Sequence, residues 1–229
     1  ARFFCLSAFF ALVAASPCWA QILGADPNRS KHIKGVIVSE RFEVPLKEVW
    51  IVDGDLSIQA RQIVIAGTLR ASNNPIAGGL DAPVIYLGAS ESVTITGQIL
   101  AGNGFDAPPG AAPTRGGNGG DIVIQAPVIR CGFPELVGGD GGAGGGGGAG
   151  GDGGSVVFIG SAVPIAPRGM GPVRGGLGGD GGKGEQGGFP GGDGGSGGHA
   201  GYFVDAWQVN HLGFKFGFGP PASGPTSPQ

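Results

Sequence analysis

Acidic residues near the starts of β-type runs are the first candidates for chemistry in this sequence. Asp53 and Asp55 lie two residues apart, and Asp121 begins a later run at the position equivalent to Asp55. Glycoside hydrolysis uses two carboxylates held close together. Val84 occupies the equivalent position in the intervening run, however, and no basic residue recurs beside the aspartates. The pattern favours aspartates of turns over a catalytic pair, and we expect no catalytic residue and no enzyme.

A second group of aspartates lies between glycine pairs, where calcium is the chemistry to consider. Asp140, Asp152, Asp180 and Asp193 each stand in a Gly-Gly-Asp-Gly-Gly setting. Calcium-binding β-rolls need a nine-residue repeat with an apolar residue two positions after an aspartate. The repeat here has a period of three, and Gly154 follows Asp152 at that offset. We therefore interpret these residues as an exposed edge and expect no metal.

Other ligand chemistries find little support. The histidines, at 32, 199 and 211, lack the spacing of metal ligands. The glycine-rich stretches are not followed by the Gly-Lys-Ser/Thr of a phosphate loop. The net charge of −3 gives no electrostatic footprint for nucleic acid. We expect no cofactor and no nucleic-acid partner.

The residues that organise the chain are its glycines, 52 of 229. In two tracts, 138–155 and 175–199, the other residues recur every third position, with one slip after Pro190. A period of three matches an extended left-handed helix of the polyproline-II type, in which Gly-Gly-X places every X on one edge. The predicted edge residues are Asp140, Ala143, Ala149, Asp152, Leu177, Asp180, Lys183, Asp193 and Ser196. The competing interpretation is a disordered glycine linker, since glycine loses most entropy on ordering.

A repeated β-type motif accompanies these tracts. The pattern x-apolar-x-apolar-x-small occurs at 55–60, 84–89, 121–126, 155–160 and 201–206, and a second motif at 63–71 returns at 93–101. Alternating apolar residues predict strands with one buried face, and stacked copies would bury that face in a parallel β-solenoid. The predicted core is Leu56, Ile58, Ile63, Ile65, Ile85, Leu87, Val93, Ile95, Ile122, Ile124, Val156, Phe158, Tyr202 and Val204. The glycine tracts then become excursions on one side, reversing near 144–148 and 189–190.

The ends of the chain have other roles. Residues 1–20 have the charged, apolar and small-x-small regions of a secretory signal peptide, with an uncleaved membrane anchor as the alternative. We expect an N-terminal cap at 21–48, the solenoid at 49–218 and a disordered Pro/Ser tail at 219–229. After cleavage the remaining cysteine is Cys131, which we interpret as a buried small side chain, an intermolecular disulfide being the alternative.

Together these motifs resemble two known groups. The Ile-x-Ile-x-Ala and Ile-x-Gly-x-Ile-x-Ala runs, followed by Gly-Gly-Asn-Gly-Gly-Asp, look like bacterial secreted right-handed β-helix proteins of the pectin-lyase-like superfold. The Gly-Gly-X tracts resemble the polyglycine-II sandwiches of certain phage tail-fibre adhesins. The resemblance implies an all-β protein that is secreted or held at the cell surface.

These observations lead to one functional hypothesis and two alternatives. The leading expectation is a non-enzymatic structural or adhesive protein that assembles into filaments or docks into a surface complex. Its partners would be other protein chains, copies of itself included, and a cell-surface glycan. The alternatives are a carbohydrate-active enzyme on the same fold, and an accessory subunit of a membrane complex if the N-terminal segment is retained.

Overall fold

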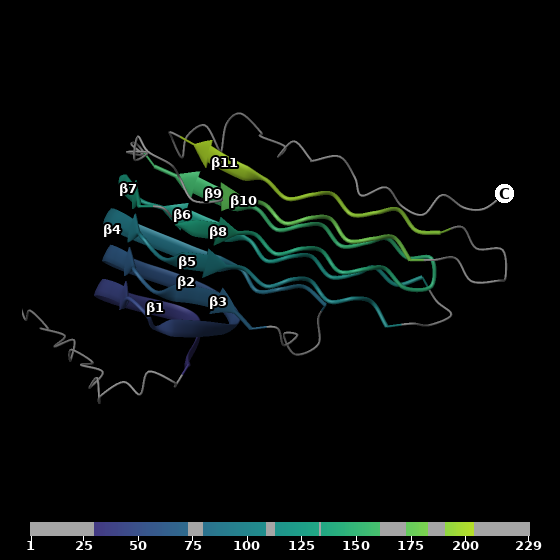
Figure 1. Ribbon diagram of the computed structural model, residues 1–229, viewed down its shortest axis with the longest axis horizontal. Coiled ribbons are helices and arrows are strands. Elements are labelled where there is room, and N and C mark those ends of the chain that lie inside the picture. The colour runs from purple at the N-terminus through teal and green to yellow at the C-terminus, as the bar shows by residue number, and fades with distance from the viewer. Residues whose placement is uncertain are drawn as a thin grey trace, which may run out of the picture.

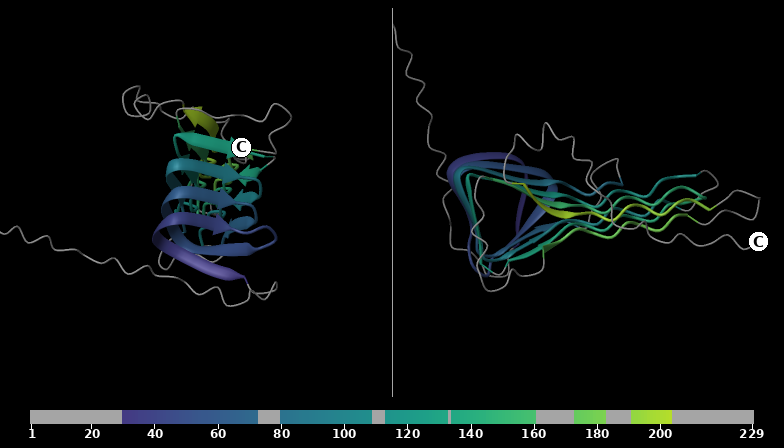
Figure 2. Two further views of the ribbon diagram at one scale, coloured as in Figure 1. Left: turned by 90° about the vertical axis from the view of Figure 1, so that its left-hand side faces the viewer. Right: turned by 90° about the horizontal axis from the view of Figure 1, so that it is seen from above.

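The computed structural model is all-β and is dominated by one parallel sheet (Figure 1). It describes residues 30–72, 80–108, 113–132, 134–160, 173–182 and 191–203. Within these described residues the sheet has eleven strands, each paired in parallel with its neighbours. It curves 289° around an axis, so that it nearly closes into a barrel-like shape (Figure 2). The prediction of an all-β fold is confirmed at this level.

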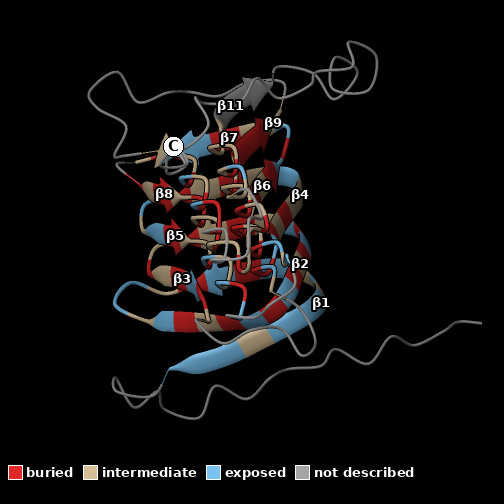
Figure 3. Cartoon of the chain, turned by 90° about the vertical axis from the view of Figure 1, so that its right-hand side faces the viewer, coloured by how far each residue is buried: buried red, intermediate tan, exposed pale blue. Residues whose placement is uncertain are grey.

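The strands are long near the N-terminus and short after it. They are β1 (Lys31–Val44), β2 (Val49–Ile65), β3 (Thr68–Ala71), β4 (Ile85–Ile95), β5 (Gln98–Leu100), β6 (Ile122–Gln125), β7 (Val128–Cys131), β8 (Glu135–Val137), β9 (Val156–Ile159), β10 (Val173–Arg174) and β11 (Ala200–Phe203). Along β2 buried and more exposed residues alternate over most of the strand. This alternation turns one face of the sheet toward the axis and the other toward solvent (Figure 3).

Like residues stack on like residues across the strands. Ile58 of β2 pairs with Leu87 of β4, which pairs with Ile124 of β6 and then with Phe158 of β9. The second motif stacks in the same way, with Ile63 paired to Val93. Parallel strands that are buried on one side need such in-register apolar rows, because a slip of one residue would turn them all outward.

The core contains all the predicted residues whose burial the structure describes. They are Leu56, Ile58, Ile63, Ile65, Ile85, Leu87, Val93, Ile95, Ile122, Ile124, Val156 and Phe158. Most of them are completely buried, and each stabilises the fold by roughly 1.5–3 kcal/mol. Tyr202 lies in β11, and Val204 lies outside the described residues. The core also includes residues that we did not predict, among them Leu136 and Ile129.

The segment predicted as a cap contributes a full strand. β1 pairs with β2 over nearly its whole length. Phe42 packs edge-on against Trp50 with ring centroids 5.3 Å apart, and the Lys31 ammonium lies 3.8 Å from the centre of the Trp50 ring. Val36 and Val38 are 70% and 75% exposed. β1 is therefore an edge strand, with its N-terminal half poorly covered and its C-terminal half in the core.

The predicted alignment of the last repeat was wrong by two residues. We aligned Tyr202 with Val156, but Ala200 pairs with Val156 and Tyr202 with Phe158. The cause lies just before the strand, where the Val156 N–H donates to the carbonyl of His199. His199 ends a three-residue repeat that runs through Asp193 and Ser196. The glycine tract thus sets the register of the strand that follows it.

Candidate functional site: a bundle of glycine-rich arms

The most distinctive feature of the molecule is a set of extended glycine-rich arms on one side of the sheet (Figures 1 and 2). Residues 101–108, 138–145 and 175–182 run away from the sheet after β5, β8 and β10, and we call them the outgoing arms. Residues 113–121, 148–155 and 191–199 run back into β6, β9 and β11, and we call them the returning arms. Together these six segments form the glycine bundle.

One reversal of direction lies within the described residues. Gly146 and Gly147 have φ angles of 56° and 82°, a region that residues with a side chain rarely adopt. The Gly148 N–H closes the turn by donating to the carbonyl of Gly145 at 2.9 Å. This turn falls within the predicted reversal at 144–148. The predicted reversal at 189–190 lies outside the described residues.

Hydrogen bonds join outgoing to returning arms at every third residue. Gly139 and Gly142 donate to the carbonyls of Gly120 and Gly117, at 3.1 and 2.8 Å. Each donor belongs to one arm and each acceptor to the arm before it in the chain. The later arms are joined by the same type of hydrogen bond. The pairs, with the N–H donor first and the carbonyl acceptor second, are Gly151–Gly142, Gly154–Gly139, Gly176–Gly154, Gly179–Gly151, Gly195–Gly179 and Gly198–Gly176.

A second set of hydrogen bonds joins arms that run in the same direction. Gly138, Gly141 and Gly144 donate to the carbonyls of Arg174, Leu177 and Asp180, at 2.8–2.9 Å. In the returning arms Gly150 and Gly153 donate to Asp193 and Ser196 in the same manner. Here the donor always precedes the acceptor in the chain. The arms therefore satisfy their backbone groups with one another, although they are not β-strands.

Glycine is required where the arms approach most closely. A Cβ added to Gly139 would overlap the carbonyl oxygen of Gly102, and one added to Gly176 would overlap that of Gly139. Most other glycines of the bundle would meet a neighbouring backbone in the same way. The obstacle is backbone, which cannot move aside as a flexible side chain can, so these close-contact positions exclude residues with a side chain.

The X positions carry a third set of hydrogen bonds, which join a side chain to the backbone of the next arm. The Asp140 N–H donates to Asn103 Oδ1 at 3.0 Å, and the Leu177 N–H donates to Asp140 Oδ1 at 2.7 Å. Asn118 Oδ1 accepts from the Asp152 N–H at 3.0 Å, and Asp152 Oδ1 accepts from the Ser196 N–H at 2.8 Å. Aspartate and asparagine suit this role because their side-chain oxygens bond readily to nearby backbone N–H groups.

The predicted edge residues lie at these X positions. Asp140, Ala143, Ala149, Asp152 and Ser196 are half-buried, and Leu177, Asp180 and Asp193 are exposed. Lys183 lies outside the described residues. Leu177, with 73% of its surface exposed, is the most exposed large apolar residue of the bundle.

The sequence analysis did not identify the lower members of this side-chain ladder as hydrogen-bond acceptors. They are Asn103, Asp106, Asn118 and Asp121, of which Asp106 accepts from the Ala143 N–H and Asp121 from the Ser155 N–H. The sequence signal that could have identified them is a constant spacing between acceptor and donor residues. These residues are 37 positions apart in the pairs Asn103–Asp140 and Asp106–Ala143 of the outgoing arms, and 34 apart in the pairs Asn118–Asp152 and Asp121–Ser155 of the returning arms.

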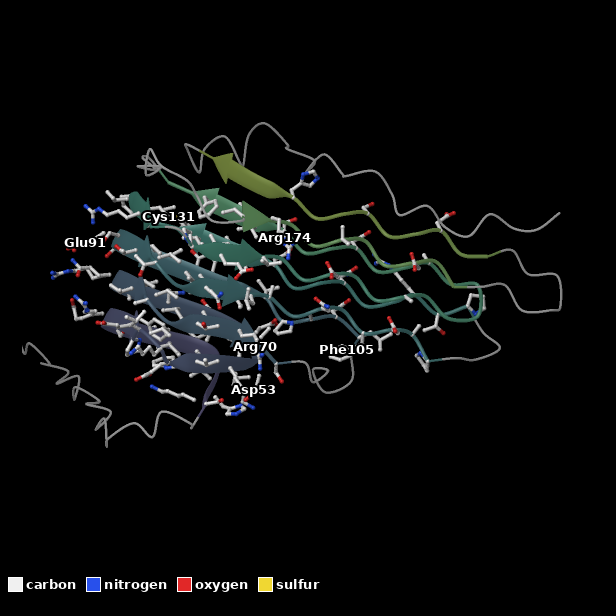
Figure 4. All side chains as sticks on the ribbon, in the orientation of Figure 1. Asp53, Arg70, Glu91, Phe105, Cys131 and Arg174 are labelled. Atoms are coloured by element: carbon white, nitrogen blue, oxygen red, sulfur yellow. The ribbon has the colours of Figure 1, made fainter. Side chains whose placement is uncertain are left out.

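The carboxylates considered for catalysis are already engaged in hydrogen bonds. Asp53 bonds His32 Nδ1 at 2.7 Å, Asp55 accepts from the Val84 N–H at 3.0 Å, and Asp121 accepts from the Ser155 N–H. Asp53 is also distant from Glu91, another carboxylate of the sheet, as Figure 4 shows. Within the described ranges no three His, Cys, Asp or Glu side chains come together as a metal site.

Cys131 lies within the core at the end of β7. Burial raises the pKa of its thiol to about 11, because the thiolate would be poorly solvated there. Since the thiolate is the reactive form, the buried thiol is protected from alkylation and disulfide exchange while the sheet is folded.

Comparison with models of protein families, with curated proteins and with solved structures finds no match to this chain. Among the described residues there is no helix of the length and apolarity that a membrane span requires.

Proposed function

We propose that this chain is a non-enzymatic structural or adhesive protein that acts outside the cell or at its surface. In this proposal a right-handed parallel β-helix of the pectin-lyase-like type carries a rigid bundle of polyglycine-II arms. The observation on which the proposal depends is the three-residue network of backbone hydrogen bonds that holds the arms together.

The sheet supports the β-helix interpretation. Its strands are parallel, its apolar residues stack in register, and its curvature of 289° leaves a single interior. Each returning arm leads into a strand that stacks directly on the corresponding strand of the previous turn. Such stacking of incomplete repeats is how solenoid proteins bury a continuous core.

The arms support the polyglycine-II interpretation. Their hydrogen bonds recur every third residue and join each arm to neighbours on more than one side. Three residues per turn is the geometry of an extended left-handed helix without internal hydrogen bonds. A glycine-rich helix of this kind has no internal hydrogen bonds to order it, and in the bundle the neighbouring arms satisfy many of its backbone groups.

A structural or adhesive role follows from what the arms present. Many backbone groups of the described arms are engaged in hydrogen bonds between arms, and the X side chains are further groups that can meet a partner. The last described outgoing arm presents Leu177 and Asp180, and the last described returning arm presents Asp193, all three exposed. A rigid edge loses little conformational entropy on binding, which favours attachment to a protein or glycan surface.

The test is retention of the purified full chain on cell envelopes and insoluble polysaccharides. Wild type should be retained, and the double variant Leu177→Ser, Asp193→Ser should be retained at least several-fold less. The matched control, Val36→Thr on β1, lies on the sheet and should be retained as wild type is. Equal retention of all three would contradict adhesion through the arms.

The same preparations distinguish the enzymatic alternative. Release of soluble saccharides by the purified chain, abolished by Asp53→Asn or Asp121→Asn, would overturn the non-enzymatic proposal. We expect no release above a heat-treated control.

A further inference from the structure

Two Asn-Gly pairs lie in the first outgoing arm and the first returning arm of the glycine bundle. They are Asn103–Gly104 and Asn118–Gly119. Asparagine is one of the thermolabile residues of proteins. A glycine after it adds to this lability, because no side chain hinders the approach of the glycine nitrogen to the asparagine side chain. Each of these two arms therefore contains a site of potential deamidation.

The packing of the arms requires a glycine in both pairs. A Cβ added to Gly104 would overlap the carbonyl group of Gly117, and one added to Gly119 would overlap that of Gly139. A bulkier residue, which would slow deamidation, cannot replace these glycines while the arms are packed. Protection from the reaction has to come from another feature of the bundle.

Deamidation of an Asn-Gly pair proceeds through a cyclic imide. The glycine backbone nitrogen attacks Cγ of the asparagine, and the Cγ–Nδ2 bond breaks, so that Nδ2 leaves as ammonia with the proton of the glycine N–H. Water then opens the imide at one of its two carbonyl groups and gives aspartate or isoaspartate. Ring closure needs ψ of the asparagine at about −120°, where Cβ and the glycine nitrogen are eclipsed, whereas ψ is about +145° in an extended chain of the polyproline-II type.

In the outgoing arms both reacting groups are hydrogen-bonded to one residue of the next arm. Asn103 Oδ1 accepts from the Asp140 N–H at 3.0 Å, and the Gly104 N–H donates to the carbonyl of Asp140 at 2.7 Å. Rotation of ψ toward the ring-closing value would pull the glycine N–H away from its acceptor. Asn103 is exposed to solvent, so these paired hydrogen bonds, and not burial, oppose the reaction at this position.

The returning arms repeat this arrangement. Asn118 Oδ1 accepts from the Asp152 N–H at 3.0 Å, and the Gly119 N–H donates to the carbonyl of Asp152 at 2.8 Å. The two pairs belong to different arms and have different partners, yet the same two atoms of each pair are engaged. Ring closure at either pair requires the next arm to be displaced.

We propose that Asn103–Gly104 and Asn118–Gly119 are latent deamidation sites, kept unreactive by the paired hydrogen bonds as long as the next arm is in place. Opening of the bundle exposes them to reaction. Isoaspartate carries the main chain through Cβ and Cγ, which adds one backbone atom and shifts all later residues of the arm out of the three-residue register. Deamidation to isoaspartate would therefore make the opening of an arm irreversible. The proposal is independent of the adhesive role.

The first test compares the folded full chain with the same chain in concentrated urea, both kept in mildly alkaline buffer. Deamidation at Asn103 and at Asn118 is followed separately by mass spectrometry of the peptides that contain them. We expect both sites to react at least tenfold more slowly in the folded chain. Equal rates in the folded and the denatured chain would overturn the proposal.

A second test displaces the next arm while the sheet remains folded. Gly139 and Gly151 directly precede the partner residues Asp140 and Asp152. A Cβ at either glycine would overlap a carbonyl of the first arms. In Gly139→Ala the rate at Asn103 should rise at least several-fold, and in Gly151→Ala the rate at Asn118 should do so.

The control for both variants is Gly54→Ala in β2, which should deamidate as slowly as wild type. Circular dichroism and the low reactivity of Cys131 show whether each variant retains its sheet. Arms that become sensitive to protease while deamidation stays as slow as in wild type would contradict protection by the paired hydrogen bonds.

The reaction products provide a readout that does not depend on rates. Asn118→Asp retains an Oδ1 acceptor and should fold with protease-resistant arms. Chains that have formed isoaspartate at position 118 in urea should regain the sheet after dilution, but their arms should remain protease-sensitive. Isoaspartate chains with arms as resistant as those of Asn118→Asp would contradict the loss of register.

Discussion

The sheet and the glycine bundle are built by opposite means within one chain. The sheet is stabilised by side chains, since Ile58, Ile63, Ile124 and their neighbours are completely buried around the axis. The bundle has almost no apolar side chains to bury, and its arms are joined by backbone hydrogen bonds at every third residue. In the sheet a glycine would leave a hole, whereas in the bundle a side chain would collide with a carbonyl group.

The difference shows how glycine, which opposes order in isolation, can build an ordered element. Ordering a glycine costs more backbone entropy than ordering any other residue. The sheet lowers this cost by fixing both ends of each out-and-back excursion one above another. Each arm then joins neighbours that are already in place, so the sheet should be able to fold without the bundle, but the bundle should not form without the sheet.

Ile124→Ala should have the largest effect, because it acts on the element on which both regions depend. Ile124 is completely buried between Leu87 and Phe158. Its truncation should lower the free energy of unfolding by about 2–5 kcal/mol, measured by urea denaturation, and both regions should be lost together. The control, Val123→Ala on the outer face of β6, should cost much less. Survival of ordered arms after the sheet has unfolded would contradict the dependence.

Gly139→Ala should break the bundle and leave the sheet. The new Cβ would overlap the Gly102 carbonyl, and overpacking of this kind costs about 1–3 kcal/mol or more. We expect accelerated proteolysis of the arms, while Cys131 stays unreactive toward iodoacetamide. The control is Gly54→Ala in β2, where a Cβ would meet only the Lys34 Cβ at 3.9 Å. Equal protease resistance of the two variants would contradict close contact between the arms.

Asn118→Ala should have a smaller effect, because it removes side-chain hydrogen bonds and preserves the backbone network. Asn118 Oδ1 accepts from the Asp152 N–H and from the Arg115 guanidinium, both at 3.0 Å. Leaving the half-buried N–H without its partner should cost about 1–3 kcal/mol of arm stability, measured by hydrogen exchange at Asp152. The exposed Asp193 provides the control, and Asp193→Ala should change little.

Ala143→Asn should stabilise the bundle slightly. Ala143 breaks the side-chain ladder of the outgoing arms, since it cannot bond the N–H of Asp180 as Asp140 bonds that of Leu177. An asparagine should supply this bond and add about 0.5–1.5 kcal/mol, seen as slower exchange of the Asp180 amide. Ala143→Ser, whose side chain is shorter, should give less. A loss of stability would show that the ladder does not extend to this position.

Much of this arrangement could be predicted from the residues, because it depends on periodicity. The period of two in Leu56 and Ile58 identified the buried rows, and the period of three in Asp140 and Ala143 identified the arms and their X positions. The third copy of the second motif was missed, because β7 is offset from β4 by 36 residues and β8 from β5 by 37. Because these two offsets differ by one residue, a search for the second motif at one fixed spacing does not find both Ile129 and Leu136.

The hydrogen-bond ladder and the register of β11 were harder to foresee. Asn103 and Asp140 are 37 residues apart, and nothing local marks them as partners until the arms are stacked. At β11 the apolar pattern favoured one alignment, while the hydrogen bond of the Val156 N–H to the carbonyl of His199 fixed another. Local periodicity predicts the elements, but contacts between distant arms decide how they are aligned.

The most direct test of the account is the backbone mobility of the glycine tracts, measured as ¹⁵N order parameters for the glycines of 138–155. If the arms form one hydrogen-bonded bundle, these glycines should have values near 0.85, as rigid backbone does, and should match those of β4 and β6. Values below about 0.6 throughout the tract, with rigid strands beside them, would show a flexible linker and contradict the account.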